Sequence, residues 1–293
     1  MLHPAPTVLT GLPSALVDPV RLFHGTAVER RDWDALGPLE RRRLVVRARA
    51  ATLQADGVVS HGSAAALWEL PDHGHPDWRL HVIDTRIRKT HSGRGVIRHV
   101  GRLAEDEVVS LDGTRVTSLL RTVVDLVHAV PFEHAVVVLD HVLRRGELDR
   151  DAIAHAVTAR RGRRGSQTAA SALAFADRAS ESPGESISRV TMRRLGVAPP
   201  VLQQEFTTAA GRFRVDFWWP DAGVIGEFDG RVKYDDRDVL WDEKRREDAL
   251  RRLPDVQSFA RWGMRDAEDP VRLAEVLVAA GLPLSRGWAR PSA

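Results

Sequence analysis

The sequence predicts two domains of mixed secondary structure, an α+β N-terminal domain followed by an α/β C-terminal domain whose core runs α-β-β-β-α-β. A chain of 293 residues is long enough for two domains that each bury a core. In the first half, short strand patterns surround the turn signal Asp112-Gly113. In the second half, two apolar runs flank the turn signal Pro220-Asp221-Ala222-Gly223. Segments with helical spacing of apolar residues stand around both sets of strands, so both halves combine helices with a sheet.

The expected boundaries divide the chain into four segments. These are a leader at 1–37, an α+β domain with a helical connector at 38–165, an α/β domain at 166–284 and a tail at 285–293. The first 25 residues contain four prolines and show no sustained apolar period, which favours a loosely attached leader. We expect the tail to fray, because it follows the last helical pattern.

The composition excludes several classes of protein. Hydrophobic residues make up 43% of the chain, as in ordinary globular proteins, and the absence of Cys excludes disulfides and thiolate zinc sites. No apolar run of about 18 residues occurs, and the N-terminus lacks the order of basic, apolar and small residues that marks a signal peptide. We therefore expect a soluble cytoplasmic protein with no membrane partner.

The positive charge of the chain is carried almost entirely by arginine. Among 43 basic residues, the lysines are Lys89, Lys233 and Lys244. Arginine donates paired hydrogen bonds to phosphate, which favours a nucleic acid as the acidic partner. A general preference for arginine across the source proteome explains the same composition equally well, and the formal net charge is only +3.

The N-terminal domain is expected to begin with two helices. Apolar residues from Leu39 to Thr52 recur at helical spacing among arginines, which predicts an amphipathic helix whose basic flank is either a solvated surface or a phosphate-binding face. A second helix is expected at 61–68, with Ser63 as its N-cap. Strands are predicted at Trp78–Ile83, Val96–Val100, Val108–Leu111 and Arg115–Thr117, and a helix at 118–129.

Three segments of this domain carry a family resemblance. In order, SHGSAAALWEL, LHVIDT and DGTRVTSLLRTVVDL resemble the antitoxin-like domain of the AbiEi type, known from type IV toxin–antitoxin systems. The resemblance implies a DNA-binding winged helix at the N-terminus and a cognate toxin as a partner, although no complete winged helix can be recognised before residue 38. Six histidines lie between 61 and 99 without Cys or acidic residues at ligand spacing, so we expect no metal site among them.

Three helices and an arginine-rich loop are expected to lead into the second domain. The helices are predicted at 131–146, at 149–159 with Asp149 as a cap, and at 167–178. Between the last two lies a six-residue connector that contains Arg160, Arg161, Arg163 and Arg164. It is either a solvated loop or a clamp for the phosphates of a nucleic acid.

The second domain is expected to open with a helix that begins at Ser182-Pro183-Gly184-Glu185 and ends at Gly196. Glu185 stands at the capping-box position, which gives it a structural role at the helix start. Strands are predicted at 201–206, 213–219, 224–228 and 256–261, with a helix at 239–253 before the last strand and a final helix from Asp269-Pro270.

Three carboxylates interrupt the apolar strands of this domain. Asp216 lies in one strand of the expected hairpin, and Glu227 and Asp229 lie two apart at the end of the other. Carboxylates are rarely buried unless they are paired or bind a metal. If the three converge, they suit Mg²⁺ or Mn²⁺, with Asp216 and Glu227 as the expected metal ligands. The alternative is that they pair with nearby arginines, namely Arg212, Arg214 and Arg231.

Four ordered motifs carry a second resemblance. The segments ESPGESISR, RVDFWWP, EFDGRVKY and EKRRED, between about residues 179 and 281, resemble the very-short-patch-repair-endonuclease-like domain, which has a PD-(D/E)xK, or restriction-endonuclease-like, core. The usual Glu-x-Lys is here Glu227-Phe228-Asp229, with Lys233 further on.

The second resemblance implies metal-dependent hydrolysis of DNA phosphodiester bonds. In that case Asp216 and Glu227 hold Mg²⁺ or Mn²⁺, and Glu185 completes the metal's surroundings. Asp229 orients a ligand or binds a second ion, and Lys233 activates water or neutralises charge on the phosphate.

Two further basic residues are candidates for nucleic-acid contact, Lys244 on the expected crossover helix and Arg261 at the end of the last strand. Pairing on the helix surface, for example between Lys244 and Asp248, is the alternative. The rival function is a catalytically inactive, antitoxin-like DNA-binding regulator of a toxin–antitoxin system. A structural role without nucleic acid is a third interpretation.

Overall fold

The computed structural model divides the chain into two compact units, each described here by itself. It describes residues 9–10, 17–53, 57–71, 77–93, 95–230 and 237–285, with only the backbone for 9–10 and 237–242. The first unit comprises residues 1–131 and 148–170, and the second unit comprises 132–147 and 171–293. The single boundary expected after residue 165 is therefore replaced by three crossings, because the segment 132–147, which contains helix Phe132–Arg145, belongs to the second unit.

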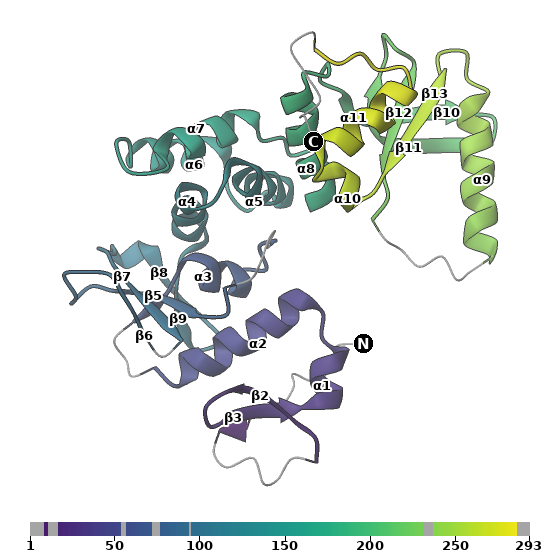
Figure 1. Ribbon diagram of the computed structural model, residues 1–293. Coiled ribbons are helices and arrows are strands. Elements are labelled where there is room, and N and C mark those ends of the chain that lie inside the picture. The colour runs from purple at the N-terminus through teal and green to yellow at the C-terminus, as the bar shows by residue number, and fades with distance from the viewer. Residues whose placement is uncertain are drawn as a thin grey trace. The chain divides into compact units, whose positions relative to one another are not determined.

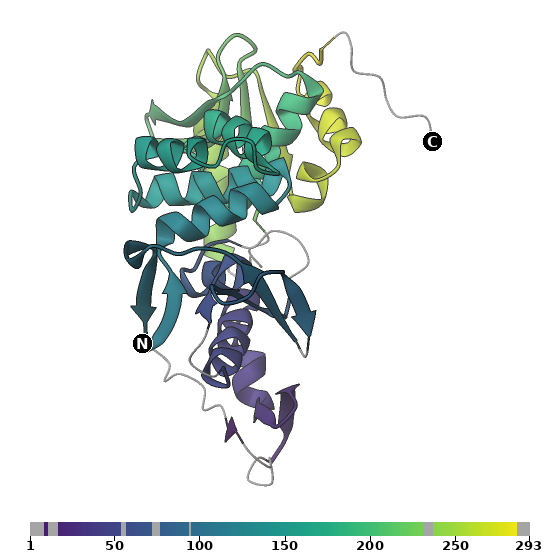
Figure 2. The ribbon, with the colours of Figure 1, turned by 90° about the vertical axis from the view of Figure 1, so that its left-hand side faces the viewer.

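The first unit begins with a small antiparallel sheet in the order β1-β3-β2, formed by β1 (Leu9–Thr10), β2 (Pro19–Phe23) and β3 (Thr26–Glu29). It continues into α1 (Arg30–Ala35). Figures 1 and 2 show the β2–β3 hairpin beside α1. The structure differs here from the loose leader expected up to residue 37. Val28 is fully buried, and Arg30 Nε donates to Asp18 Oδ2 at 2.8 Å, so residues 18–30 are tied together.

A six-stranded mixed sheet forms the body of the first unit. Its order is β6-β7-β5-β4-β9-β8. The strands are β4 (Val58–Val59), β5 (Leu80–Asp84), β6 (His91–Gly93), β7 (Val96–Val100), β8 (Val108–Leu111) and β9 (Thr114–Thr117). The predictions for β7 and β8 are confirmed, and those for β5 and β9 are within two residues. The short strands β4 and β6 are additional.

Helix α2 (Pro38–Ala51) packs with α3 (His61–Leu67) against this sheet through Val46, Leu67 and Val82. Part of the basic flank of α2 makes contacts within the protein, while Arg47 remains 41% exposed. The buried Arg42 donates to the Gly62 carbonyl at 3.1 Å, and Arg43 Nη1 lies 2.6 Å from Glu69. This part of the flank is thus used within the protein.

Ser63 does not cap α3 as predicted, because the helix begins earlier and Ser60 occupies the N-cap position. Ser63 instead ties α3 to the sheet, since its hydroxyl accepts a hydrogen bond from His81 N at 2.9 Å. Helix α4 (Leu119–Ala129) follows β9 and is capped by Ser118. Helix α6 (Arg150–Thr158) starts at Asp149, which caps it as predicted, and α7 (Ser166–Phe175) runs across the division between the units.

The second unit has the predicted element order α-β-β-β-α-β. Its core elements are α8 (Pro183–Leu195), β10 (Val201–Thr208), β11 (Gly211–Trp219), β12 (Val224–Phe228), α9 (Arg237–Arg251) and β13 (Ser258–Trp262). The sheet order is β10-β11-β12-β13, and only the pair β12/β13 is parallel. Helix α9 covers one face, and α8 covers the other together with α10 (Met264–Ala267) and α11 (Pro270–Ala279) (Figure 1).

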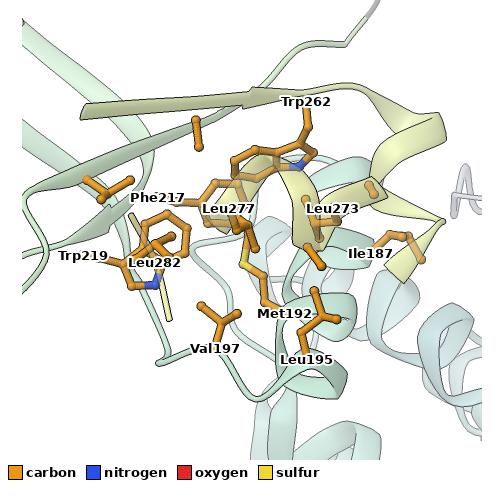
Figure 3. Packing of buried hydrophobic residues seen from close by; sticks show 14 of the residues in the cluster. Ile187, Met192, Leu195, Val197, Phe217, Trp219, Trp262, Leu273, Leu277 and Leu282 are labelled. Carbon is orange, nitrogen blue, oxygen red and sulfur yellow. The ribbon is translucent and has the colours of Figure 1, made fainter. Parts of the chain in front are cut away.

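Aromatic side chains fill the core between the sheet and α8, α10 and α11 (Figure 3). Phe217 and Trp262 lie with ring centroids 5.3 Å apart, and Trp219 stacks near Phe217 at 6.2 Å. Gly226 makes this possible, because a Cβ there would lie 2.7 Å from Trp262 and 2.8 Å from Trp219. These tryptophans therefore serve packing.

Helix α5 (Phe132–Arg145) joins the second unit through a buried ionic network. Asp140, only 1% exposed, accepts hydrogen bonds from Asp177 N, Ser186 Oγ and Arg189 Nη1 at 2.7–2.8 Å. The side chain thus links α5 to α8 and to the segment before it. In the part of the chain that is described, no helix has the length and apolar character needed to cross a membrane.

Candidate functional site

The centre of the candidate site is the point where β11 and β12 separate. Their ladder pairs Trp219 with Val224, Trp218 with Ile225 and Phe217 with Gly226, and it stops there. Beyond it, Asp216 Oδ2 accepts a hydrogen bond from Phe228 N at 2.9 Å. The carboxylate therefore takes the place of a main-chain acceptor and is fixed in the opening between the strands.

Strand β11 changes its packing face at Asp216. Phe213 and Val215 pack with Leu250 on the α9 side, whereas Phe217 and Trp219 pack on the α8 side. Residues two apart in a regular strand share a face, so the strand rotates between 215 and 217. The rotation leaves Asp216 near the plane of the sheet.

Gln203 on β10 accompanies this change and was not predicted as a site residue. It lies beside Asp216, between the pairs Leu202 with Phe217 and Gln204 with Val215, and its φ of +53° is in the left-handed region. Such a conformation is costly for a residue other than glycine, and strained residues cluster at functional sites. The sequence gives no signal for a left-handed Gln within a strand pattern.

The Gln203 side chain stands between the buried Glu185 and the half-buried Asp216. Its Nε2 donates to Glu185 Oε2 at 3.0 Å. Burial raises the pKa of both carboxyl groups, and the charge of Asp216 raises that of Glu185 further. The hydrogen bond from Phe228 N and the charge of Arg246 partly offset the rise for Asp216.

Glu185 serves the helix and faces the site at the same time. Ser182 Oγ accepts a hydrogen bond from Glu185 N at 3.2 Å, as in a capping box, but the Glu185 carboxylate accepts from Glu181 N at 2.9 Å, one residue before the N-cap. Gly184 sets the position of the helix end, since a Cβ there would lie 1.9 Å from the Phe228 ring. This close contact places Glu185, which is 6% exposed, beside Asp216.

Glu227 is held on the α9 side by two guanidinium groups. Arg246 Nη2 lies 2.7 Å from its Oε1, and Arg261 Nη2 lies 3.0 Å from its Oε2. Glu227 is 7% exposed, and its Oε1 has the ionic contact without the geometry of a hydrogen bond. Burial raises the pKa of Glu227, and the two arginines counteract this rise.

Arg261 belongs to this intramolecular network. Its Nη2 also lies 2.8 Å from Glu243 and 3.2 Å from Glu247 on α9. Burial lowers its pKa, but the surrounding carboxylates outweigh that effect and the pKa is raised. The predicted nucleic-acid contact of Arg261 therefore requires these ion pairs to open.

The remaining predicted residues of the second unit lie apart. Asp229 is exposed, and its amide donates to the Trp262 carbonyl at 2.9 Å. Lys233 and Arg231 lie outside the described residues. Lys244 is exposed on α9, where the ion pairs within the helix are Arg246 with Glu243 and Arg251 with Glu247.

The four predicted carboxylates thus lie in three different environments. Glu185 and Asp216 meet at Gln203, Glu227 is paired with arginines, and Asp229 is at the surface. Among the described side chains, no three Asp, Glu or His are gathered closely enough to hold a metal ion.

The arginines of the loop at 160–165 in the first unit differ in exposure. Arg160 is largely buried and contacts Asp125, which also accepts from Arg121 Nε at 2.9 Å. The other members of the predicted clamp, Arg161, Arg163 and Arg164, are exposed. Three of the four arginines therefore remain available to a phosphate.

The first unit holds an array of imidazoles that the sequence pattern did not predict. His81 Nδ1 lies 3.0 Å from His99 Nε2, and the His61 ring stacks on His99 with centroids 4.0 Å apart. Asp77 Oδ2 lies 3.2 Å from His81 Nε2. Burial lowers the pKa of His61 and of His99 to about 4, so both rings are neutral at pH 7.

Two curated relatives match the chain, both uncharacterised proteins of Mycobacterium tuberculosis, from the strains CDC 1551 / Oshkosh and ATCC 25618 / H37Rv. Each is 32% identical over 170 residues, which is 57% of this chain and 60% of the relative. The match thus spans less than two thirds of the length of these relatives. No family model matches the chain, and no solved structure matches it.

Proposed function

We propose that the second unit is a nuclease domain of the PD-(D/E)xK class that hydrolyses DNA phosphodiester bonds with a divalent cation. The observation that carries this proposal is that the buried Glu185, held by Gln203, and the half-buried Asp216, held by Phe228 N, are both placed at the strand opening. Within the described part of the chain, neither carboxylate forms an ion pair. The element order α-β-β-β-α-β and the four sequence motifs support the class.

The chemistry of these residues fits a hard cation. Two buried carboxylates side by side disfavour each other's ionisation, and a divalent cation would relieve that repulsion. Oxygen ligands suit Mg²⁺ or Mn²⁺. Asp216, Glu185 and Glu227 would hold the ion, which would require Glu227 to exchange an arginine for it. When bound, the ion would supply Lewis-acid stabilisation of a phosphodiester and of a nucleophilic water.

The protein's own residues would position the substrate and the ligands. Gln203 and Phe228 N hold the Asp216 carboxylate at the strand opening. Arg246 and Arg261 are close enough to Glu227 to contact a phosphate at the same place once they are released. In this proposal, Lys233 activates water or neutralises charge on the phosphate, and Asp229 assists at the exposed side. Exposed Arg161, Arg163, Arg164 and Lys244 would contact the DNA backbone.

The test is DNA cleavage with Mg²⁺ or Mn²⁺ by the wild type, Asp216→Asn and a matched control, Glu205→Gln. Glu205 is a carboxylate on the neighbouring strand β10 that pairs with Arg212 at the surface. We expect Asp216→Asn to reduce cutting by at least about a hundredfold, in the range of a lost transition-state contact, while Glu205→Gln cuts normally. Equal cutting by all three proteins, or none by the wild type on single-stranded, duplex and mismatched DNA, would exclude the proposal.

A second candidate function is an antitoxin-like DNA-binding regulator without catalysis. The observation that favours it is the pairing of Glu227 with Arg246 and Arg261, which gives the carboxylate a role that needs no cation. A regulator of this kind would bind the DNA upstream of its own gene in the presence of a chelator, and it would bind a cognate toxin. Electrophoretic mobility shift with EDTA, with and without Mn²⁺, separates the two functions.

A further inference from the structure

The first unit contains a cavity of about 580 Å³ on the face of its six-stranded sheet opposite α2 and α3. Val59 and Val82 pack against these helices, and their neighbours Val58 and Ile83 line the cavity. Adjacent residues of a strand point to opposite faces of a sheet, so the cavity lies on the second face. Its volume is within the range of about 300–1,000 Å³ that is typical of small-molecule sites.

The loop at 101–105 forms one wall of this cavity and is held by the protein itself. The loop approaches the sheet closely where it begins, since a Cβ at Gly101 would lie 3.1 Å from Ile83 Cγ2. Further along, Ala104, which lines the cavity, donates from its amide to Glu107 Oε2 at 3.0 Å. A wall that is already fixed does not have to be ordered when a ligand binds, which favours binding.

The lining combines an apolar surface with a small number of charged groups. Besides Val58 and Ile83, its apolar part includes Leu103 and Val108. Its charged part consists of two arginines and one carboxylate, which leaves an excess of one positive charge. These charged residues are Arg86, Arg115 and Glu105. An apolar surface with a net positive charge at its rim complements a molecule that has an apolar body and an acidic group.

The contacts of Arg86 keep positive charge at one end of the cavity. Its Nε lies 3.2 Å from Asp84 Oδ1, and its amide donates to the same oxygen at 3.1 Å. Asp84, which is 3% exposed, also lies 3.1 Å from Arg98 Nη1. Because one buried carboxylate is shared by two guanidinium groups, it does not neutralise both of them. The end of the cavity at Arg86 therefore remains attractive to an anion.

We propose that this cavity binds a small amphipathic anion, whose apolar body lies against Val58 and Ile83 and whose acidic group contacts Arg115. Burial of the apolar body supplies affinity, and arginine orients the ligand because it forms paired hydrogen bonds with acidic groups. A cavity of this volume accommodates a small molecule and not a DNA duplex. All residues that line it belong to the first unit, so the inference goes beyond the proposed nuclease and does not depend on it.

The experiment is a fluorescence titration of the full chain with two probes that share an apolar aromatic body. Anilinonaphthalene sulfonate carries an anionic group, and phenylnaphthylamine is uncharged. Arg115→Gln removes a charge from the lining, and Ala104→Trp occupies part of the cavity from an exposed position. Arg88→Gln is the matched control, because Arg88 is an exposed arginine in the segment after β5 and is not among the lining residues. Thermal unfolding of each variant shows whether it is folded.

We expect Arg115→Gln to bind the sulfonate probe about tenfold more weakly than the wild type, since a lost hydrogen bond to a charged group is of that order. Its affinity for the uncharged probe should stay within about twofold of the wild type. Ala104→Trp should bind both probes about tenfold more weakly or worse, because the indole takes up space that the aromatic body needs. Arg88→Gln should bind both probes as the wild type does.

Three results would overturn the inference. The first is that the wild type binds neither probe. The second is that folded Ala104→Trp binds both probes as tightly as the wild type, because the probes would then be bound elsewhere. The third is that Arg115→Gln loses affinity for the two probes equally, or no more than Arg88→Gln does for the sulfonate probe, because Arg115 would then not select an anion.

Discussion

Each unit contains a cluster of buried polar side chains, and the two clusters treat charge in opposite ways. In the first unit, Asp125 lies between Arg121 and Arg160, and the nearby imidazoles of His61 and His99 are neutral. In the second unit, the buried Glu185 accepts from Glu181 N and Gln203 Nε2, and the half-buried Asp216 accepts from Phe228 N, with the charge of Arg246 acting on Asp216. Among the described residues, neither carboxylate forms an ion pair. Ion-paired charges are typical of structural networks, whereas carboxylates held only by neutral donors are candidates for a binding site, so the second unit is the place to test for binding.

The largest effect is expected from breaking the compensated cluster. Asp125→Ala should lower the free energy of unfolding by about 3–5 kcal/mol, because it removes the carboxylate shared by Arg160 and the buried Arg121, which keeps only its contact with Glu107 among the described ion pairs. Urea denaturation measures this. The control is Asp112→Asn, which removes an exposed pair with Arg47, tolerates the left-handed φ of +47° and should cost less than about 1 kcal/mol. Similar losses in both variants would mean that the Asp125 network has no special structural role.

The second-largest effect tests what holds Glu185 next to Asp216. Gly184→Ala should destabilise the protein by about 1–3 kcal/mol, since the new methyl group would overlap the Phe228 ring. Phe228→Leu in the same chain should recover part of that loss, and the double-mutant cycle measures the coupling. Purely additive effects would show that α8 is not positioned through this contact.

A smaller effect of opposite sign is expected from Asp216→Asn. The amide keeps an oxygen that can accept from Phe228 N, and it removes a buried charge next to Glu185. We expect the free energy of unfolding at pH 7 to rise by about 1 kcal/mol, because the substitution removes the repulsion between two neighbouring carboxylates. Functional sites often keep such unfavourable arrangements at a cost in stability. A loss of stability similar to that of Asp125→Ala would erase the distinction between the two clusters.

The smallest effect is a difference in pH dependence between the units. The pKa of His61 and His99 falls from 6.5 to about 4 on folding, so their contribution to stability is present above about 6.5 and is lost as the pH falls toward about 4. The pKa of Glu185 and of Asp216 is raised, so their contribution is present below the ordinary carboxyl pKa and is lost as the pH rises through the raised value.

Acidification should therefore loosen β5 and β7 around the imidazoles and tighten the start of α8 and the end of β12. Amide hydrogen exchange of the full chain at several pH values, corrected for the intrinsic rate, measures both regions at once. Glu185→Gln should reduce the pH dependence at the first turn of α8 without changing that of β5, while Asp140, whose pKa is raised to about 6 by burial, continues to act on Ser186 and Arg189. If acidification changed the exchange rates of both regions in the same direction, the prediction of opposite effects would be wrong.

Local patterns in the sequence were sufficient for much of the fold. Asp149, Ser182 and Asp269 accept hydrogen bonds at the helix starts where they were expected, and Gly196 ends α8 in the left-handed conformation. Capping depends on residues within one turn, which explains this success. The leader expected at 1–37 differs from the structure over residues 17–37, because the strands there are short and depend on pairing. The prediction that Ser63 caps α3 was wrong, because Ser63 instead bonds His81, which is distant in sequence.

The candidate site was only partly predictable, because its geometry depends on contacts between residues that are distant in sequence. Alternation placed Glu227 and Asp229 on one face of their strand, and their convergence with Asp216 was an expectation; instead, β11 rotates at Asp216, Arg246 and Arg261 hold Glu227, and Asp229 is exposed. Gln203 could not be anticipated, since its importance comes from its φ angle and from contacts with two distant carboxylates. Helix positions and caps are encoded locally, whereas the ionic partners arise only when the chain has folded.

Because α5 belongs to the second unit, neither unit is one continuous stretch of the sequence. A gene truncated at a single codon cannot encode either unit whole: a fragment that starts after residue 165 lacks Asp140, and Arg189 and Ser186 would face solvent or an empty space. On the ribosome, likewise, α5 emerges before most of the sequence with which it packs. A fragment that contains the whole second unit would have to begin near residue 132 and replace 148–170 with a linker.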